Sequence, residues 1–418
     1  MAEYIERLWN PVDETAGLGR RDRKPGRYLA YIPDELKANL PQLSTEANEA
    51  AADALAVLAR ADERIGASGK YLNHLLIRSE SISSSWIEGN RITPKKLAIA
   101  ETLGQGGRVA LDVVANVRAT EEAISKLSDP ARDITTADIV ALQHVIEPSL
   151  SPGLRTEQNW VGGAGWSPLR ADFIPPPETE VAQLVDNLAQ FLTATHGNPI
   201  VRAAIAHAQF ETIHPFIDGN GRTGRALIHT VLKRADAVRN TLIPISTVFA
   251  GNTDAYIGGL TQYRAIPTQL DDWIIAFAQA TELAAANAVR LSESISRVDT
   301  EERERLTAYR TSHGKTPSIP RANAVIRKIL DLLPQEPVLT TQHIVKRLGC
   351  SPTAAHLALT ELNEAGILGR TKDQKGKLVC WTADHYLSLV ALTERSNRVG
   401  GGDTFGNPPH LGPPRPEL

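Results

Sequence analysis

The sequence contains few of the residues that mark secreted or membrane proteins. Cysteine occurs only twice in 418 residues, at Cys350 and Cys380, which excludes a disulfide framework and favours a reducing compartment. No run of about 18 uncharged apolar residues is present, and the charged N-terminus lacks the apolar core of a signal peptide. We therefore expect a cytoplasmic protein that makes no contact with membranes.

Aromatic residues and net charge are also scarce. Aromatics make up 5% of the chain and hydrophobic residues 42%, a balance typical of a packed, mainly helical protein. A formal net charge of −3 indicates no general attraction to nucleic acid. The P-loop pattern and the protein-kinase signature set are absent, which excludes those two ways of binding a nucleotide.

The length and the apolar periodicity predict several domains. Residues 1–110 predict an N-terminal helical domain that is extended or irregular up to about residue 44. Residues 111–297 predict a helical core that ends in a long helix over 270–297. Within that core, glycine and proline residues between 153 and 177 predict a small hairpin or an ordered loop.

The C-terminal part differs in composition from the core. Residues 298–320 are polar and charged and predict a linker, the first part of which can be helical. Residues 321–392 predict three helices followed by a hairpin with a basic tip, which is the order of a winged helix-turn-helix domain. Residues 393–418 are rich in glycine and proline and predict a disordered tail.

One segment, His214–Arg225, combines the groups that a nucleotidyl or phosphoryl transfer centre needs. Its glycines and asparagine lie before a predicted helix, where backbone N–H groups can bind an anion. Arg222 and Arg225 are three residues apart, so both side chains leave one face of the first turn and can hold a polyphosphate. Asp218 is an oxygen ligand suited to Mg²⁺, and His214 is a base with a pKa near neutral pH.

This segment resembles the Fic family motif, H-x-F-x-D/E-G-N-G-R-x-x-R, at every position. The resemblance implies a helical Fic core with a small β-hairpin flap, and a protein adenylyltransferase that uses ATP and Mg²⁺. His214 would deprotonate a serine, threonine or tyrosine hydroxyl of a target protein, which would attack the α-phosphate of ATP, and Asp218 would bind the metal. The residues implied to bind ATP are Gly219, Asn220, Gly221, Arg222, Gly224, Arg225 and Tyr256.

A second motif, Ser84 to Gly89, resembles the inhibitory motif of the same family, S/T-x-x-x-E-G/N. The resemblance implies a regulatory role for Ser84, Glu88 and Gly89, with Glu88 paired to Arg225 in place of the γ-phosphate. ATP would then bind in an orientation unsuited to in-line attack. A serine-rich helix end without a regulatory role is the alternative interpretation.

Three further parts of the sequence are expected to lie near this segment or to support it. Arg155 and residues 171–177 resemble the flap of Fic proteins, whose edge would pair with a strand of the target. Tyr256 resembles a residue of the adenine pocket, although Ile257 stands where many relatives have a second tyrosine. His207 is expected to be packed or hydrogen-bonded rather than catalytic.

Partners and alternative functions stay open at this stage. The expected partners are a target protein with a hydroxyl side chain, the chain itself as an acceptor, and a second copy in a homodimer. DNA binding stays an open alternative. The predicted recognition helix over 352–365 weakens it, because that helix carries Glu361 and Glu364 and few cations. The alternative functions are an ATP-sensing winged-helix transcriptional regulator and a Fic enzyme that acts as a deadenylylase.

Overall fold

Helices form most of the protein, as the composition predicted. The computed structural model describes residues 2–11, 24–66, 72–163, 167–194, 196–372 and 379–396. The helices of the first three quarters of the chain are α1 (Thr45–Gly66), α2 (Leu72–Ile87), α3 (Pro94–Leu103), α4 (Arg108–Lys126), α5 (Thr136–Ile146), α6 (Glu178–Thr193), α7 (Pro199–Ile213), α8 (Asn220–Arg234), α9 (Ser246–Gly251), α10 (Thr253–Tyr263) and α11 (Leu270–Ser312). None of the described helices is both long enough and apolar enough to cross a bilayer.

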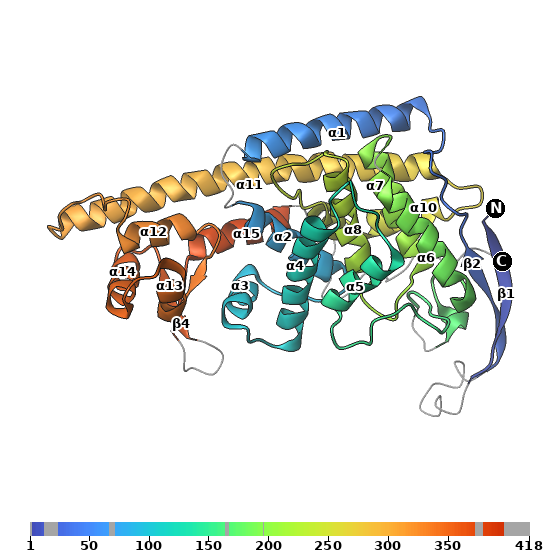
Figure 1. The fold of residues 1–418 in the computed structure, drawn as a ribbon, viewed down its shortest axis with the longest axis horizontal. Coiled ribbons are helices and arrows are strands. Elements are labelled where there is room, and N and C mark those ends of the chain that lie inside the picture. The colour runs from blue at the N-terminus through green and yellow to red at the C-terminus, as the bar shows by residue number, and fades with distance from the viewer. Residues whose placement is uncertain are drawn as a thin grey trace.

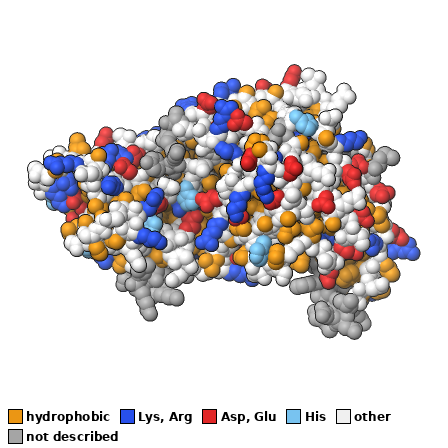
Figure 2. All heavy atoms as spheres, in the orientation of Figure 1, with side chains coloured by type: hydrophobic (Ala, Val, Ile, Leu, Met, Phe, Trp, Pro, Cys, Tyr) orange, Lys and Arg blue, Asp and Glu red, His pale blue; other side chains and the backbone are white. Residues whose placement is uncertain are grey.

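Helices α7 and α8 lie at the centre of the helical core (Figure 1). Every residue of α7 is buried, which fits a helix that is largely apolar on all sides. The loop between α7 and α8 is the motif loop, so the rigid centre of the fold positions the candidate site. Acidic and basic side chains are mixed over the visible surface rather than gathered by sign (Figure 2), which agrees with the small net charge.

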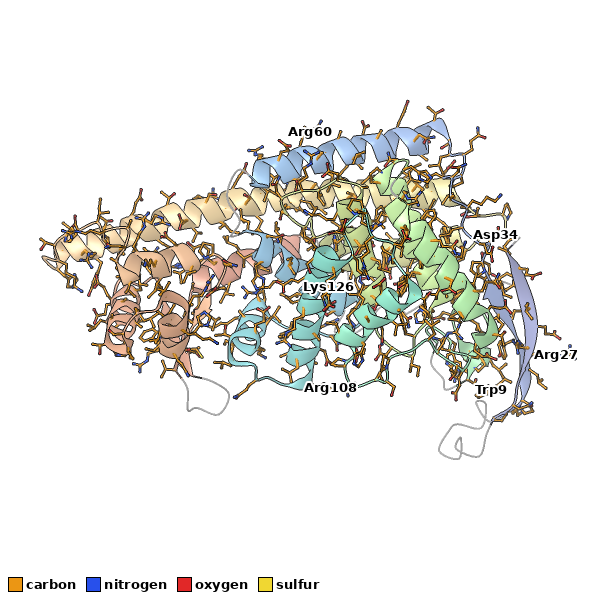
Figure 3. All side chains as sticks on the ribbon, viewed as in Figure 1. Trp9, Arg27, Asp34, Arg60, Arg108 and Lys126 are labelled. Carbon is orange, nitrogen blue, oxygen red and sulfur yellow. The ribbon has the colours of Figure 1, made fainter. Side chains whose placement is uncertain are left out.

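The N-terminal segment corrects the expectation of an extended or irregular chain before a purely helical domain. Strands β1 (Glu3–Trp9) and β2 (Gly26–Ile32) pair antiparallel, with Tyr4 opposite Tyr31. Aromatic contacts attach this ribbon to the core, because Trp9 packs edge-on against Trp160 with ring centroids 5.6 Å apart. Figure 3 labels Trp9 and Arg27 on the ribbon. Periodicity was too short here to reveal strands whose partner surface lies more than 100 residues away in sequence.

Helix α11 occupies the first part of the predicted linker over 298–320, which the sequence left open as helical. It continues unbroken past Arg297 to Ser312 and runs along α1 (Figure 1). Its charged second half keeps a buried stripe that includes Leu306, which is 1% exposed, and Arg303 bonds back to Asp299 one turn earlier. The charges that suggested a linker are therefore the exposed side of an amphipathic helix.

The C-terminal part contains α12 (Val325–Leu332), β3 (Val338–Leu339), α13 (Thr341–Leu348), α14 (Pro352–Glu364), β4 (Gly369–Lys372), β5 (Val379–Thr382) and α15 (Asp384–Ser396). The three strands form an antiparallel sheet in the order β3-β5-β4. Strand β3 and helix α15 were not predicted, and α15 replaces the first four residues of the predicted tail. The basic hairpin tip at 373–378 and the tail from 397 lie outside the described residues. The winged-helix assignment and the remaining domain boundaries stay predictions.

Candidate active site

The end of α7 places His214. His214 takes a left-handed conformation (φ 48°), which turns the chain out of the helix at a cost of about 1 kcal/mol for a residue other than glycine. Its backbone carbonyl accepts hydrogen bonds from Arg155 Nε (3.0 Å) and Asn159 Nδ2 (3.2 Å). Arg155 also donates to the carbonyls of Glu157 and Pro176, so one buried guanidinium links the predicted flap to the motif loop.

The flap is less regular than the predicted hairpin. Val161 and Phe173 form a single antiparallel bridge, and residues 164–166 between them lie outside the described part of the chain. A short 3-10 turn, Pro168–Arg170, occupies the intervening segment. The face of Phe173 packs under the Arg264 guanidinium, 4.0 Å from the ring centroid.

The loop itself is held by Asn220. The Phe216 N–H donates to Asn220 Oδ1 (2.9 Å), and Asn220 Nδ2 donates back to the Phe216 carbonyl (2.8 Å). Phe216 is 1% exposed and belongs to the main hydrophobic core, so it anchors the loop. Gly219 has a φ of 80°, which a residue with a side chain rarely adopts, and α8 begins directly after it. The first turn of α8 therefore points its N–H groups out of a rigid loop.

A carboxylate lies against that first turn. A methyl group at Gly221 would lie only 1.9 Å from Glu88 Oε1. Glu88 follows the last residue of α2, and Gly89 (φ 84°) turns the chain away after it. The N-terminal end of α8 favours negative charge, so Glu88 occupies the position suited to an anion.

Arg225 binds Glu88 and Ser84 together. Its Nε donates to the Ser84 hydroxyl (2.9 Å), and its Nη2 donates to the Ser84 carbonyl (2.9 Å) and to Glu88 Oε1 (2.7 Å). Burial lowers the pKa of Arg225, but Glu88, Tyr256 and Glu211 together more than offset burial, so the pKa is raised overall. The structure thus brings together two regions that are 137 residues apart in sequence.

Arg222 lies in a different environment from Arg225. It forms a buried ion pair with Glu147, and Asp218 Oδ1 lies 3.6 Å from its Nη2. Its Nε and Nη1 have no hydrogen-bond partner among the described residues. Glu147 was not predicted, because it lies 75 residues before Arg222, at the end of α5, with no local signal.

Asp218 is the residue best suited to a metal. Its side chain is 62% exposed at the mouth of the loop, and Gln143 Nε2 holds its backbone carbonyl (3.0 Å). No group of three or more His, Cys, Asp or Glu side chains suited to a metal occurs in the described part of the chain. Mg²⁺ commonly binds one or two carboxylates and completes its shell with water and substrate phosphates, so a single exposed Asp218 fits that ion.

His214 is a neutral base in this environment. Burial, with the positive charges of Arg264 and Arg155, lowers the pKa of the imidazole to about 3, although the side chain stays 20% exposed. Its Nδ1 lies 4.0 Å from Oε2 of Glu211, one turn earlier on α7. Burial raises the pKa of Glu211 to about 7. The sequence analysis missed both Glu211 and Arg264, although a carboxylate inside an otherwise apolar helix is a signal that could have found Glu211.

Tyr256 and His207 close the buried side of the site. Tyr256 donates or accepts at His207 Nε2 (2.8 Å) and stacks on Phe249 with ring centroids 4.5 Å apart. His207 is fully buried and hydrogen-bonded, so the expectation of a packed histidine is confirmed. Gly224 faces α7, since a methyl group there would lie 2.8 Å from Glu211 Oε1 and 3.2 Å from His207 Nδ1.

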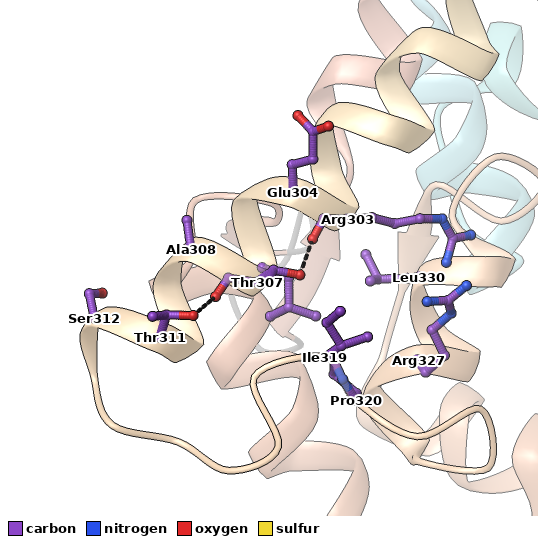
Figure 4. A pocket seen from close by; sticks show the side chains of 11 residues that line it. Arg303, Glu304, Thr307, Ala308, Thr311, Ser312, Ile319, Pro320, Arg327 and Leu330 are labelled. Carbon is purple, nitrogen blue, oxygen red and sulfur yellow. Dashed lines mark hydrogen bonds between the residues drawn. The ribbon is translucent and has the colours of Figure 1, made fainter.

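A separate pocket of about 780 Å³ lies against the second half of α11, away from the motif residues (Figure 4). Its lining includes Arg303, Thr307, Ile319 and Leu330. The hydroxyls that enter this area, such as Thr307 Oγ1, bond to carbonyls of their own helix. None of the predicted site residues lines this pocket.

Comparison with known proteins gives matches to one family. The Fic/DOC family model matches residues 133–232. "Protein adenylyltransferase Fic" of Drosophila melanogaster is 36% identical over 110 residues, which cover 25% of this chain and 20% of that protein. The protein of the same name from Drosophila erecta is 29% identical over 210 residues, 47% of this chain and 39% of that protein. The chain thus spans between a fifth and two fifths of the length of these relatives.

Solved structures give matches of the same kind. A Fic family protein from Desulfovibrio desulfuricans G20 is 21% identical, covers 82% of this chain and 97% of its own, and has a TM-score of 0.46. Fic-1 from C. elegans is 18% identical, covers 59% and 74% of the two chains, and has a TM-score of 0.45.

Proposed function

Since this chain is a Fic-domain protein, we propose that it transfers AMP from ATP to a serine, threonine or tyrosine hydroxyl of a target protein. One observation carries the proposal. The N-terminal end of α8 presents an anion site with Arg225 beside it, and a neutral His214 lies at the other end of the motif loop. Such an arrangement can bind a triphosphate and accept a proton from an attacking hydroxyl.

Each residue then has a defined task. The target hydroxyl gives its proton to His214 Nε2 as its oxygen bonds to the α-phosphorus, and the bond to pyrophosphate breaks. Asn220 keeps the loop rigid, and Arg222 and Arg225 hold the phosphates. Asp218 would hold Mg²⁺, which would supply charge neutralisation for the phosphates.

The same geometry supports autoinhibition by Glu88. The Glu88 carboxylate binds Arg225 Nη2 at 2.7 Å and lies over the first turn of α8 at Gly221. A γ-phosphate at this position would meet a negative charge and lose the guanidinium, so ATP would bind without the orientation for in-line attack. In this proposal the structure is the inhibited form of the enzyme.

The test is AMP transfer by three proteins: wild type, Glu88→Gly, and Glu88→Gly/His214→Ala. Each is incubated with Mg²⁺, a lysate as a source of targets, and ATP labelled at the α-phosphate. We expect at least tenfold more labelled protein with Glu88→Gly than with the other two, including label on the chain itself. ATP labelled at the γ-phosphate is the control, since label from that position would identify phosphoryl transfer instead.

The opposite result would favour a different function. If no variant transfers label although all three bind ATP, the Fic domain is a nucleotide sensor, and the C-terminal domain becomes the candidate output. If the wild type instead removes AMP from labelled target, the deadenylylase alternative holds. These measurements do not test three further hypotheses: the identity of the target, homodimer formation and DNA binding.

A further inference from the structure

We infer that Glu211 is a positioning residue for His214: its carboxylate holds the imidazole tautomer that leaves Nε2 free to accept a proton. For the reaction that His214 serves, the inference rests on the proposed AMP transfer. The geometry itself belongs to the described residues alone. Glu211 is assigned no role by the Fic-type motif, which begins at His214.

The Glu211 carboxylate faces a buried ring nitrogen of His214 that has no hydrogen-bond partner among the described residues. Glu211 Oε2 lies 4.0 Å from His214 Nδ1, on the last turn of α7. His214 Nδ1 and Glu211 Oε1 are both buried, and neither has a hydrogen-bond partner among the described residues. Buried polar atoms without partners are costly, and catalytic hydrogen bonds are often long before substrate binds, so this contact is suited to tighten in use.

The fold leaves space for the Glu211 carboxylate at Gly224 of α8. A methyl group at Gly224 would lie 2.8 Å from Glu211 Oε1, so α8 packs against the carboxylate only because it has a glycine there. Helix α7 is otherwise apolar over much of its surface, and a leucine at position 211 would satisfy its packing without burying a charge. A buried carboxylate retained at this cost is typical of a functional site.

Charged groups lie around the pair. Arg225 on α8 and Arg264 after α10 favour the ionised carboxylate, whereas burial, and Glu88 after α2, favour the protonated form. Tyr256 on α10 also lies within electrostatic range of Glu211. Because burial outweighs the arginines, the pKa of Glu211 is raised to about 7, and its charge changes near neutral pH.

The charge state decides the tautomer of His214. An ionised Glu211 carboxylate would accept a hydrogen bond from Nδ1–H. The backbone carbonyl of Glu211 also favours a proton on the ring. Nε2 then keeps its lone pair and can take the hydroxyl proton, and the carboxylate balances the charge of the resulting imidazolium. A protonated Glu211 instead donates to Nδ1, which leaves the proton on Nε2 and removes the base.

The experiment compares Glu88→Gly with Glu88→Gly/Glu211→Gln between pH 5.5 and 8.5, at saturating Mg²⁺ and target. We expect the parent to lose activity as the pH falls and the Glu211 carboxylate takes up a proton, at a pH below about 7, because the Glu88 charge that raises this pKa is absent. The Gln variant should show a kcat lower by about 10²-fold, a KM for ATP changed less than threefold, and no such fall in rate. An unchanged kcat with the same acid limb would overturn the inference.

A second measurement does not depend on transfer. Histidine labelled with ¹⁵N in the otherwise wild-type chain reports the tautomer of His214, with His214→Ala to assign its signals. We expect protonated Nδ1 at pH 8, and a change of tautomer or of titration midpoint in Glu211→Gln but not in the matched variant Glu121→Gln. Identical His214 signals in both variants would refute the inference. Failure of the parent to transfer AMP would refute only the proposed function.

Discussion

At the scale of single residues, Gly221 leaves the space that the Glu88 carboxylate occupies beside the first turn of α8. A methyl group there would lie 1.9 Å from Glu88 Oε1 and 2.8 Å from Arg225 Nη1. The first clash involves the inhibitory residue and the second a guanidinium, which can shift. The cost of a side chain at 221 should therefore depend on whether Glu88 is present.

Gly221→Ala should lower the free energy of unfolding of the wild type by about 1–3 kcal/mol, the usual cost of overpacking. In the Glu88→Gly background the cost should fall below half of that, because alanine is the better helix former by about 1 kcal/mol. Denaturant unfolding of the four proteins measures this coupling. Costs that add to within about 0.5 kcal/mol would show that Glu88 does not contact position 221 in solution.

The candidate residues that the structure brings together are those with short-range signals in the sequence. His214, Asp218 and Arg225 lie in one segment of twelve residues, and the pairing of Glu88 with Arg225 followed from a second motif. Glu147 and Arg264 could not be found, because each reaches the site from another helix and has no distinguishing neighbours. Long-range ion pairs of this kind depend on how helices pack, which a single sequence does not reveal.

At the scale of elements, α2 and the first turns of α8 face each other through a row of polar contacts spaced one helical turn apart. Glu80 lies 3.0 Å from His229 Nε2, and Ser84 and Glu88 both bind Arg225. Positions 80, 84 and 88, on α2 and just after it, are four residues apart, while the α8 partner moves back four residues from His229 to Arg225, which binds the last two. In the proposed autoinhibition, this contact between α2 and α8 carries the inhibition, and Glu88 is its last member.

Ser84→Ala should relieve inhibition only in part. It removes the hydroxyl that accepts from Arg225 Nε but leaves the Ser84 carbonyl and Glu88 in place. A hydrogen bond from a charged donor contributes about 1.5 kcal/mol or more, so the rate of AMP transfer should rise about tenfold and stay below that of Glu88→Gly. The control is Ser81→Ala on the same helix, whose buried hydroxyl has no partner among the described residues. Equal rates for Ser84→Ala and Ser81→Ala would contradict this role.

Element prediction failed where partners are distant, and it left open how far the long helix continues into the charged segment after Arg297. The strands β1 and β2 gain much of their stabilisation from Trp160 and the flap, which the N-terminal sequence cannot indicate. The continuation of α11 beyond Arg297 depends on Leu306 facing the C-terminal part. In both cases the exposed face of the element is visible in the sequence, but the surface that packs against its other face is not.

At the scale of the whole molecule, the continuous α11 changes how the C-terminal part relates to the Fic domain. The acidic residues of α14, which weakened the case for DNA binding, both contact α11, although Glu364 is also exposed. Glu361 pairs with Arg310 and with Lys315 Nζ (3.2 Å), and Glu364 accepts from the Tyr309 hydroxyl (2.6 Å). The C-terminal part is therefore packed on the long helix of the core, and DNA binding remains a hypothesis that these acids no longer weigh against.

Glu361→Ala should loosen this packing without affecting the catalytic core. The Glu361 and Arg310 side chains are 16% and 12% exposed, and loss of a partly buried charged hydrogen bond costs roughly 1–2 kcal/mol. Amide hydrogen exchange in α14 should therefore accelerate by about tenfold, while α7 and α8 keep their protection, because their contacts lie elsewhere. Glu304→Ala, on the exposed side of the same α11, is the matched control and should leave all three helices unchanged. Equal acceleration in α7 and α8 would mean that the core and the C-terminal part unfold as one unit, and that α11 transmits stability between them.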